Sequence, residues 1–257
     1  MWCGSSDLTE GRAAMDGEIE KLQRIIDESE NLVFFGGAGV STESGIPDFR
    51  SADGIYQQKV GREVSPEEMI SHSFYVRYPD EFFAFYKDKL IYPNAEPNAC
   101  HRALAKLEEK GKLKAVVTQN IDGLHQKAGS RTVYELHGSV LRNYCEHCHA
   151  VFGVDTVLQA DGVPKCDKCG ARIKPDVVLY EESLDEDVME NAVRAIAAAD
   201  TLIIGGTSLV VYPAAGLVRY FHGKNLVLIN KSVTQQDRYA ELVIHAPIGE
   251  VFSKLRI

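Results

Sequence analysis

The sequence predicts an α/β protein with a doubly wound parallel sheet, to which a smaller second domain and a helical insertion are added. Short runs rich in Val, Ile and Leu alternate with helical stretches, which is typical of parallel strands buried on both faces. Two segments interrupt this alternation: one is aromatic and helical, the other rich in cysteine and glycine. A chain of 257 residues is long enough for one large domain with such insertions.

The predicted sheet is formed by strands at 31–37, 113–120, 200–208, 225–230 and 241–246. Helices are predicted at 16–29, 97–110, 185–199, 213–222 and 249–255, and Pro97 suits the first turn of its helix. Ligands of doubly wound sheets bind beyond the carboxyl ends of the strands, so the residues that follow each strand are the first candidates for a site.

The two interruptions set the expected domain boundaries. We assign residues 15–51, 97–139 and 176–257 to a Rossmann-like domain, 52–96 to a helical insertion and 140–175 to a metal-binding module. We expect the two insertions to pack together as the smaller domain. Residues 1–14 are polar, and we expect a flexible extension before a helix that starts near Met15.

Composition and charge exclude several classes of partner. The formal net charge of −9 and the pI of 5.4 argue against general nucleic-acid binding, and the alternative is a local basic patch. No apolar stretch approaches the roughly 20 residues that span a bilayer. The N-terminus lacks the basic and apolar regions of a secretory signal. We therefore expect a cytoplasmic protein with neither membrane nor direct nucleic-acid partners.

Four of the six cysteines form two C-x-x-C pairs, Cys145 with Cys148 and Cys166 with Cys169. Four thiolates complete the tetrahedral coordination of zinc and leave no open position, so the pattern predicts a structural zinc site. The alternatives are redox chemistry and a chance pairing, and His147 and His149 could compete as ligands. Cys100 is predicted to fill the core.

The segment "GGAGVSTESG" follows the first strand. A glycine turn after a strand lets the backbone approach a pyrophosphate and directs N–H groups toward it. The alternative is a turn that only reverses the chain. The spacing is not G-x-G-x-x-G, and no acidic residue follows a second strand at the distance expected for ribose binding. These observations favour a nucleotide but argue against an ordinary dehydrogenase.

Polar residues follow other strands of the predicted sheet: Gln119, Asn120, Asp122, His125, Thr207, Ser208 and Asn230. Their positions favour a ligand site, although an Asx-capped helix start would also explain residues 118–125. His137 lies at a domain junction, where a cleft is expected and a histidine can act as a general base. The alternative for His137 is a structural histidine.

Taken together, these motifs resemble the sirtuin family of NAD-dependent protein lysine deacylases. The matching segments are "GAGVSTESGIPDFR", "TQNIDGLHQKAG", "LHG", the paired C-x-x-C, "GTSLVVYPAAG" and the strand that ends at Asn230. They occur in the order found in the family and extend from about residue 16 to the C-terminus. The resemblance implies a Rossmann-like domain, a small zinc-binding domain, and a cleft between them for cofactor and substrate.

The resemblance also implies which residues bind NAD. Ala38, Thr42, Phe49 and Arg50 would lie on the nicotinamide side, on a loop that is mobile until NAD binds, and Gln119, Asn120, Ile121 and Asp122 would form the pocket for nicotinamide and its ribose. Thr207, Ser208 and Asn230 would contact the adenosine half, and Ile248 would close the adenine pocket. Gly37, Gly39, Asp48, Gly205 and Lys231 complete the implied cofactor set.

The implied reaction transfers the acyl group of an acylated lysine to ADP-ribose and releases nicotinamide. His137 would act as the general base toward a ribose hydroxyl, and Asn120 is the second implied catalytic residue. The acylated peptide would add as a strand between "VVLYEE" and "LVVYP", beside Val178, Tyr180 and Val210. We expect the protein to be a monomer.

Two departures from the family pattern affect substrate choice. Tyr180-Glu181-Glu182 stands where the family commonly has Phe-Gly-Glu, and the added charge predicts a bias toward basic peptides. Tyr86 and Lys89 share a helix face and would resemble the Tyr-x-x-Arg pair that reads succinyl or malonyl groups, unless they are an ordinary core tyrosine and a solvated lysine. Deacetylation is therefore the first expectation. The alternatives are desuccinylation or demalonylation, protein ADP-ribosyl transfer, and an inert structural module.

Overall fold

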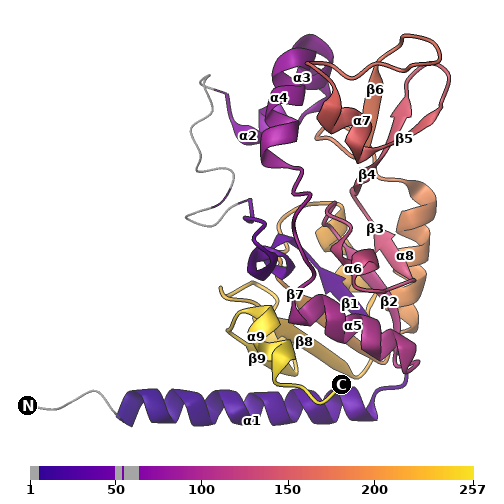
Figure 1. Ribbon diagram of the computed structural model, residues 1–257. Coiled ribbons are helices and arrows are strands. Elements are labelled where there is room, and N and C mark those ends of the chain that lie inside the picture. The colour runs from indigo at the N-terminus through magenta and orange to yellow at the C-terminus, as the bar shows by residue number, and fades with distance from the viewer. Residues whose placement is uncertain (1–5, 50–53, 55–63) are drawn as a thin grey trace, which may run out of the picture.

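The computed structural model describes residues 6–49, 54 and 64–257. Arg50, which the resemblance places in the cofactor site, lies outside the described residues, as do residues 1–5, 51–53 and 55–63. Figure 1 shows a large sheet in the middle of the molecule, helix α1 (Ser6–Glu28) across one end and a smaller group of helices and strands at the other.

The large sheet has six parallel strands in the order β3-β2-β1-β7-β8-β9. Their bounds are β1 Leu32–Gly36, β2 Leu113–Thr118, β3 Val133–Glu135, β7 Thr201–Gly205, β8 Asn225–Ile229 and β9 Leu242–Ile244. Connections run outward in opposite directions from the β1–β7 pair, which makes this pair the topological switch point. The carboxyl ends of these two strands are therefore the expected place for a ligand.

Helices cover both faces of this sheet, so the doubly wound fold is confirmed. Leu32 and Phe34 pack on one face against α1, α5 (Ala99–Glu109) and α9 (Ile248–Ser253). Val33 and Phe35 point to the opposite face, where they pack with α8 (Glu186–Ala198) and the 3-10 helix η4 (Ala214–Tyr220). The near-continuous apolarity of the strands follows from burial on both faces.

Two predicted helices differ from the structure. Helix α1 begins at Ser6, well before Met15, so much of the expected flexible extension is helical. Its early sequence contains several strong helix formers, among them leucine, alanine, glutamate and arginine. The helix expected at 213–222 is the shorter 3-10 helix η4, in which Gly216 lowers the propensity for a regular α-helix.

The smaller domain contains a three-stranded antiparallel sheet of β5 (Val151–Gly153), β4 (Gly138–Cys145) and β6 (Ile173–Val177), in that order. Its helices are α2 (Pro66–Met69), α3 (His72–Arg77), α4 (Pro79–Lys89) and α7 (Val154–Gln159). Aromatic side chains of α3 and α4, including Tyr75 and Phe82, share one hydrophobic core with Val140 and Val177. The two insertions therefore pack as one unit.

Short elements complete the part of the chain that the structure describes. They are the 3-10 helices η1 (Ala38–Val40), η2 (Thr42–Ser44) and η5 (Asp237–Tyr239) and the helix α6 (Leu124–Lys127). Within the described residues, no helix has both the length and the apolar character required to cross a membrane.

Candidate active site

A cavity of about 680 Å³ opens at the carboxyl ends of β1, β2, β7 and β8 and extends to the smaller domain. This volume is within the range of ligand-binding pockets. The sequence-derived site residues that line it are Gly37, Ala38, Gly39, Thr42, Asp48, Phe49, Lys89, Gln119, Asn120, Ile121, Asp122, His137, Val178, Tyr180, Thr207, Ser208, Val210, Asn230, Lys231 and Ile248. Segments far apart in the sequence thus meet at the switch point.

The glycine turn after β1 packs directly on the turn after β7. The Gly39 N–H donates to the Gly206 carbonyl at 2.8 Å, and a Cβ on Gly39 would lie 2.8 Å from the Gly206 Cα. Gly206 itself has a φ of +61°. Side chains at these positions would separate the two turns, so the glycines keep the backbone open to a ligand.

Gly205 is the implied cofactor residue that the structure places behind the cavity. It ends β7, and a Cβ there would lie 2.2 Å from Ile248 Cδ1. Its neighbour Gly206 lines the cavity instead. The sequence motif located the turn but not which of its two glycines faces the ligand.

Ser41, which sequence reasoning missed, links two predicted site residues. Its hydroxyl donates to Asp122 Oδ2 at 2.6 Å and accepts from Asn120 Nδ2 at 3.1 Å. Asp122 Oδ1 accepts from the Leu124 N–H at the start of α6, so both carboxylate oxygens have partners. Burial raises the pKa of Asp122, which these two hydrogen bonds oppose. The signal was present in the sequence, since Ser41 lies inside the glycine motif.

His137 lines the cavity, and one of its ring nitrogens is fixed by a hydrogen bond. Its Nδ1 lies 2.9 Å from the Gln119 carbonyl oxygen, which can only accept, so Nδ1 carries the proton and Nε2 keeps a lone pair. Burial lowers the pKa of His137, and the hydrogen bond to Gln119 partly opposes this shift. The arrangement provides a neutral imidazole base.

Gly138 follows His137 with a φ of +75°, and a Cβ there would lie 2.0 Å from the Asp176 carbonyl oxygen. Only glycine fits this position. It allows β4 to leave the histidine alongside β6, and the Val178 N–H then donates to the His137 carbonyl at 3.0 Å. His137 and residues 178–182, which we call the peptide-side segment because the sequence predicts peptide binding there, are thereby connected through the backbone.

On the far side of the cavity, Asn230 holds the turn after β7. Its Oδ1 accepts from the Thr207 N–H and its Nδ2 donates to the Thr207 carbonyl, both at 2.9 Å. Gln119 Nε2 donates to the Thr207 hydroxyl at 3.1 Å. Asn230 thus fixes the loop that carries Thr207 as well as lining the cavity.

Part of the cavity wall is apolar and exposed. Val210, Tyr212 and Val233 line the cavity with exposed fractions of 55%, 75% and 77%. Tyr180 also lines the cavity, and its backbone is already paired on one edge, since the Tyr180 N–H donates to the Ile70 carbonyl and the Tyr180 carbonyl accepts from the His72 N–H. No pattern in the sequence indicates that Val233 lines the cavity.

Glu181 adopts a φ of +75°, in the left-handed region that favours glycine. Its carboxylate accepts from the Ser73 N–H at 2.8 Å, near the start of α3, and hydrogen bonds from Ser73 lower the pKa of Glu181. The neighbouring Glu182 accepts from the Leu179 N–H and from Lys174 Nζ and pairs with His72. Both acids therefore fasten the peptide-side segment to the smaller domain.

The two residues proposed to read a carboxylated acyl group are separated by the structure. Tyr86 is fully buried, stacks on Phe82 with ring centroids 5.7 Å apart, and is absent from the cavity lining. Lys89 lines the cavity and pairs with the adjacent Asp88 at 3.0 Å. The structure thus places Tyr86 in the aromatic core of the smaller domain and only Lys89 at the cavity.

His125, one of the polar residues after the second predicted strand, lies in the core instead of the cavity. It is fully buried, and its ring centroid is 4.7 Å from that of His101. Burial lowers the pKa of His125 well below its usual value. Both histidines are therefore neutral core residues.

The sulfur atoms of Cys145, Cys148, Cys166 and Cys169 lie within 4.8 Å of one another. The Sγ atoms of Cys145 and Cys169 are 3.3 Å apart and those of Cys148 and Cys166 are 3.6 Å apart, too far for disulfides. Four sulfurs at about 2.3 Å from a zinc ion would be roughly 3.8 Å apart, so the set fits tetrahedral zinc.

The comparisons with known proteins agree with this geometry. A model of the Sir2 family matches residues 37–213 of the chain. The NAD-dependent protein deacetylase of Clostridium perfringens is 66% identical over 242 residues, which cover 94% of this chain and 99% of that protein. The NAD-dependent protein deacetylase of Clostridium acetobutylicum is 59% identical over 235 residues, covering 91% and 96% of the two chains.

Solved structures give the same result at the level of the fold. A Sir2 complex with a p53 peptide and NAD+ is 40% identical with a TM-score of 0.80, covering 92% of this chain and 96% of that chain. A Sir2 structure with a deacetylated p53 peptide and 3′-O-acetyl ADP-ribose is 39% identical with a TM-score of 0.83, covering 91% and 96%.

Proposed function

This chain belongs to the Sir2 family, and we infer that it is an NAD-dependent protein lysine deacetylase. The enzyme transfers the acetyl group from lysine to ADP-ribose and releases nicotinamide. The observation that carries this inference is His137, held through Nδ1 in a cavity shared by the glycine turns and the peptide-side segment. A general base is thereby placed where a dinucleotide and a peptide can meet.

The backbone and side-chain groups that line the cavity are of the kinds that can bind NAD. The close contact between the Gly39 and Gly206 turns keeps backbone groups open to a pyrophosphate. We propose that Gln119, Asn120, Ile121 and Asp122 bind nicotinamide and its ribose, with Ser41 holding Asn120 and Asp122 in place. Thr207, Ser208, Asn230, Lys231 and Ile248 are proposed for the adenosine half.

When bound, NAD would supply a ribose carbon joined to nicotinamide, at which the acetyl-lysine oxygen can form a bond as the bond to nicotinamide breaks and nicotinamide leaves. The role proposed for His137 is to accept the proton of a ribose hydroxyl at Nε2, while Nδ1 remains bonded to the Gln119 carbonyl. Asn120 is proposed as the second catalytic residue, oriented by its bond to Ser41. Phe49 lines the cavity and would exclude water from the reacting sugar.

Acetylated lysine in a protein or peptide is the proposed substrate. The peptide would add as a strand along Val178, Tyr180 and Val210, using backbone groups for affinity. Two further properties are proposed. The first is a monomeric state, and the second is a cytoplasmic location, where thiols remain reduced and the cysteine cluster can hold zinc.

A zinc ion held by these four thiolates would have a structural role. Cys145 ends β4 and Cys148 lies in the turn that follows, whereas Cys166 and Cys169 precede β6, so the ion would tie the β4–β5 hairpin to the start of β6. Four protein thiolates leave no coordination position for substrate or water.

The deciding experiment incubates the purified protein with NAD and matched acetyl, succinyl and malonyl peptides and follows every product by mass. We expect free lysine peptide, nicotinamide and O-acetyl-ADP-ribose in equal amounts, and much less product from the other acyl groups. His137→Ala is the control that should lose the reaction. Transfer of ADP-ribose to protein without deacetylation would contradict the proposal.

A further inference from the structure

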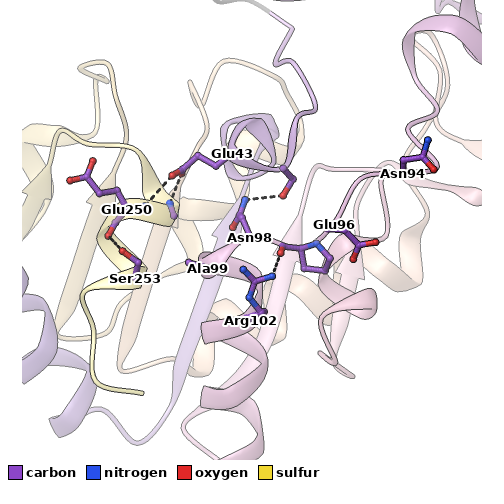
Figure 2. A pocket seen from close by; sticks show the side chains of 11 residues that line it. Glu43, Asn94, Glu96, Asn98, Ala99, Arg102, Glu250 and Ser253 are labelled. Atoms are coloured by element: carbon purple, nitrogen blue, oxygen red, sulfur yellow. Dashed lines mark hydrogen bonds between the residues drawn. The ribbon is translucent and has the colours of Figure 1, made fainter.

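The turn that carries the predicted NAD-binding residues is fastened on its outer side by Glu43. The Glu43 carboxylate accepts from the Gly249 N–H at 2.6 Å through Oε2 and from the Glu250 N–H at 3.1 Å through Oε1 (Figure 2). Gly249 and Glu250 belong to the first turn of α9, directly after Ile248. One side chain on η2 therefore joins two parts of the cavity wall that are 206 residues apart in sequence.

A second side chain holds the same turn from α5. Asn98, which is buried, donates through Nδ2 to the Val40 carbonyl at 2.7 Å. The same Nδ2 donates to the Ser44 hydroxyl at 3.0 Å (Figure 2). Gly45 follows with a φ of +83° and ends η2. Glu43 and Asn98 thus hold the segment from Val40 to Ser44 from outside.

The inner side of this fixed segment faces the cavity. Ser41 and Thr42 line it, and the Ser41 hydroxyl is the link between Asn120 and Asp122. Glu43 is adjacent to Thr42 and two residues from Ser41. A shift of Glu43 would therefore move both hydroxyls relative to the residues proposed to bind nicotinamide and its ribose.

We propose that Glu43 is a positioning residue for NAD, which sets the affinity of the cavity by clamping η2 to α9. It does not touch the dinucleotide; it acts through Ser41 and Thr42. The inference rests on the proposed function, because it assumes that the cavity binds NAD. Two charge-assisted hydrogen bonds to backbone N–H groups make the clamp strong enough to matter.

Gly249 gives an independent way to break the clamp. A Cβ at this position would lie 2.8 Å from Glu43 Oε2 and 2.9 Å from its Cδ, and the three nearest atoms all belong to Glu43. Gly249→Ala should therefore displace the carboxylate in the parent protein. Once Glu43 is shortened to alanine, the same methyl group has room, and the second substitution should cost nothing more.

The test is a double-mutant cycle on the full-length, zinc-loaded protein. The Kd for NAD is measured by calorimetry without peptide for the parent, Glu43→Ala, Gly249→Ala and the double variant. We expect each single variant to bind NAD roughly tenfold more weakly, as when one charge-assisted bond is lost, and the double variant to match Glu43→Ala. The KM for NAD should rise in parallel, with the KM for the acetyl peptide unchanged.

Glu96→Ala is the matched control. Glu96 is another exposed acid of the same surface depression (Figure 2), but it pairs with Lys127 at 2.7 Å and does not contact η2. Its Kd should equal that of the parent. Glu43→Gln, which keeps one acceptor oxygen, should give an intermediate Kd, and it provides the same test if the alanine variant melts early.

The proposed role of Glu43 would be contradicted by an unchanged Kd for NAD in Glu43→Ala. It would also be contradicted if the effects of the two single variants on this Kd added up in the double variant. Failure of the proposed function gives a different result, because the parent protein itself would then bind no NAD.

Discussion

His137, which we propose as the general base, differs from the buried pair His101 and His125 in its surroundings and not in residue type. His101 accepts from the Asn98 N–H in a capping box, and burial lowers the pKa of His101 to about 4. His125 is enclosed against its ring. His137 differs because one nitrogen is fixed by a carbonyl and the ring lines a cavity. Of these three histidines, His137 is the one that combines a neutral ring with an accessible lone pair.

The pH dependence of deacetylation follows from the lowered pKa of His137. The base form is the neutral ring, so kcat/KM falls as the pH drops through this pKa. Because burial lowers the pKa of His137 from its ordinary value, the neutral ring should persist to a lower pH than a free imidazole, and activity should decline only on the acid side of that ordinary value. Peptide kcat/KM measured from pH 5 to 8 checks this, and an acid-side inflection above pH 7 would contradict it.

Two variants accompany that measurement. His137→Ala should lower kcat by at least about 100-fold, the usual contribution of a general base, with the Kd for NAD little changed. His222→Gln alters an exposed histidine outside the cavity and should leave the profile as it is.

Tyr86 leads to a prediction about both stability and acyl preference. Its buried hydroxyl has no hydrogen-bond partner within the described part of the chain. Tyr86→Phe should therefore raise the free energy of unfolding by about 1 kcal/mol and leave the ratio of acetyl to succinyl activity unchanged. Urea denaturation and matched peptides measure the two quantities.

Lys89→Met is the companion variant, because Lys89 does line the cavity. It should reduce only the minor succinyl activity, since a flexible lysine provides a weak and solvent-screened contact. A changed ratio of acetyl to succinyl activity in Tyr86→Phe would contradict the prediction and indicate that Tyr86 contributes to the acyl pocket.

At the scale of elements, the strands were the most predictable part of the fold. Burial on both faces makes β1, β2, β7 and β8 continuous apolar runs, and this signal is local in the sequence. The start of α1 and the 3-10 form of η4 were not predicted, because helix ends depend on propensities that differ little between neighbouring residues.

The turn at Glu181 gives a prediction about peptide choice. Its left-handed backbone explains why glycine suits this position, and its bond to the Ser73 N–H offsets the strain. Glu181→Gly should therefore leave stability nearly unchanged, because the strain and the hydrogen bond are lost together. The exposed carboxylate still lines the cavity, so the preference for basic over acidic flanks should decrease in the variant.

Turnover of acetyl-lysine peptides with basic and with acidic flanks measures this preference. Glu181→Gln keeps the side-chain shape without the charge and should lose the preference to the same extent. Equal turnover of both peptides by the parent protein would contradict this prediction. It would show that the Glu181 carboxylate interacts with the Ser73 N–H of α3 and not with the peptide.

At the scale of the molecule, the sequence indicated most of the site because its residues follow strands that converge at one edge of the sheet. The links between segments were not predictable. Glu43 accepts a hydrogen bond from Gly249, and Glu181 accepts one from Ser73. The partners are far apart in the sequence, so no local pattern predicts these bonds. Ser41 and Gly206 lie inside recognised motifs, yet only the three-dimensional structure shows which member of each motif faces the cavity.

Removal of zinc should disrupt the three-stranded sheet of the smaller domain and leave the six-stranded sheet folded. The core beside the metal site is small, with Cys145, Cys166 and Ile173 as its buried members, so the three-stranded sheet depends on the ion. His137 immediately precedes β4, and its carbonyl accepts from Val178, which follows β6. Loss of this small sheet would thus release both the base and the peptide-side segment.

We therefore expect a strong chelator to abolish deacetylation while the six-stranded sheet stays folded, because its two cores contain no residue of the three-stranded sheet. Circular dichroism should show partial loss of structure, and calorimetry should show NAD binding that is weakened but measurable. Cys166→Ser should reproduce the effect without chelator, and added zinc should restore activity only to the chelated parent protein. Full activity in metal-free protein would show that the smaller domain holds His137 without the ion.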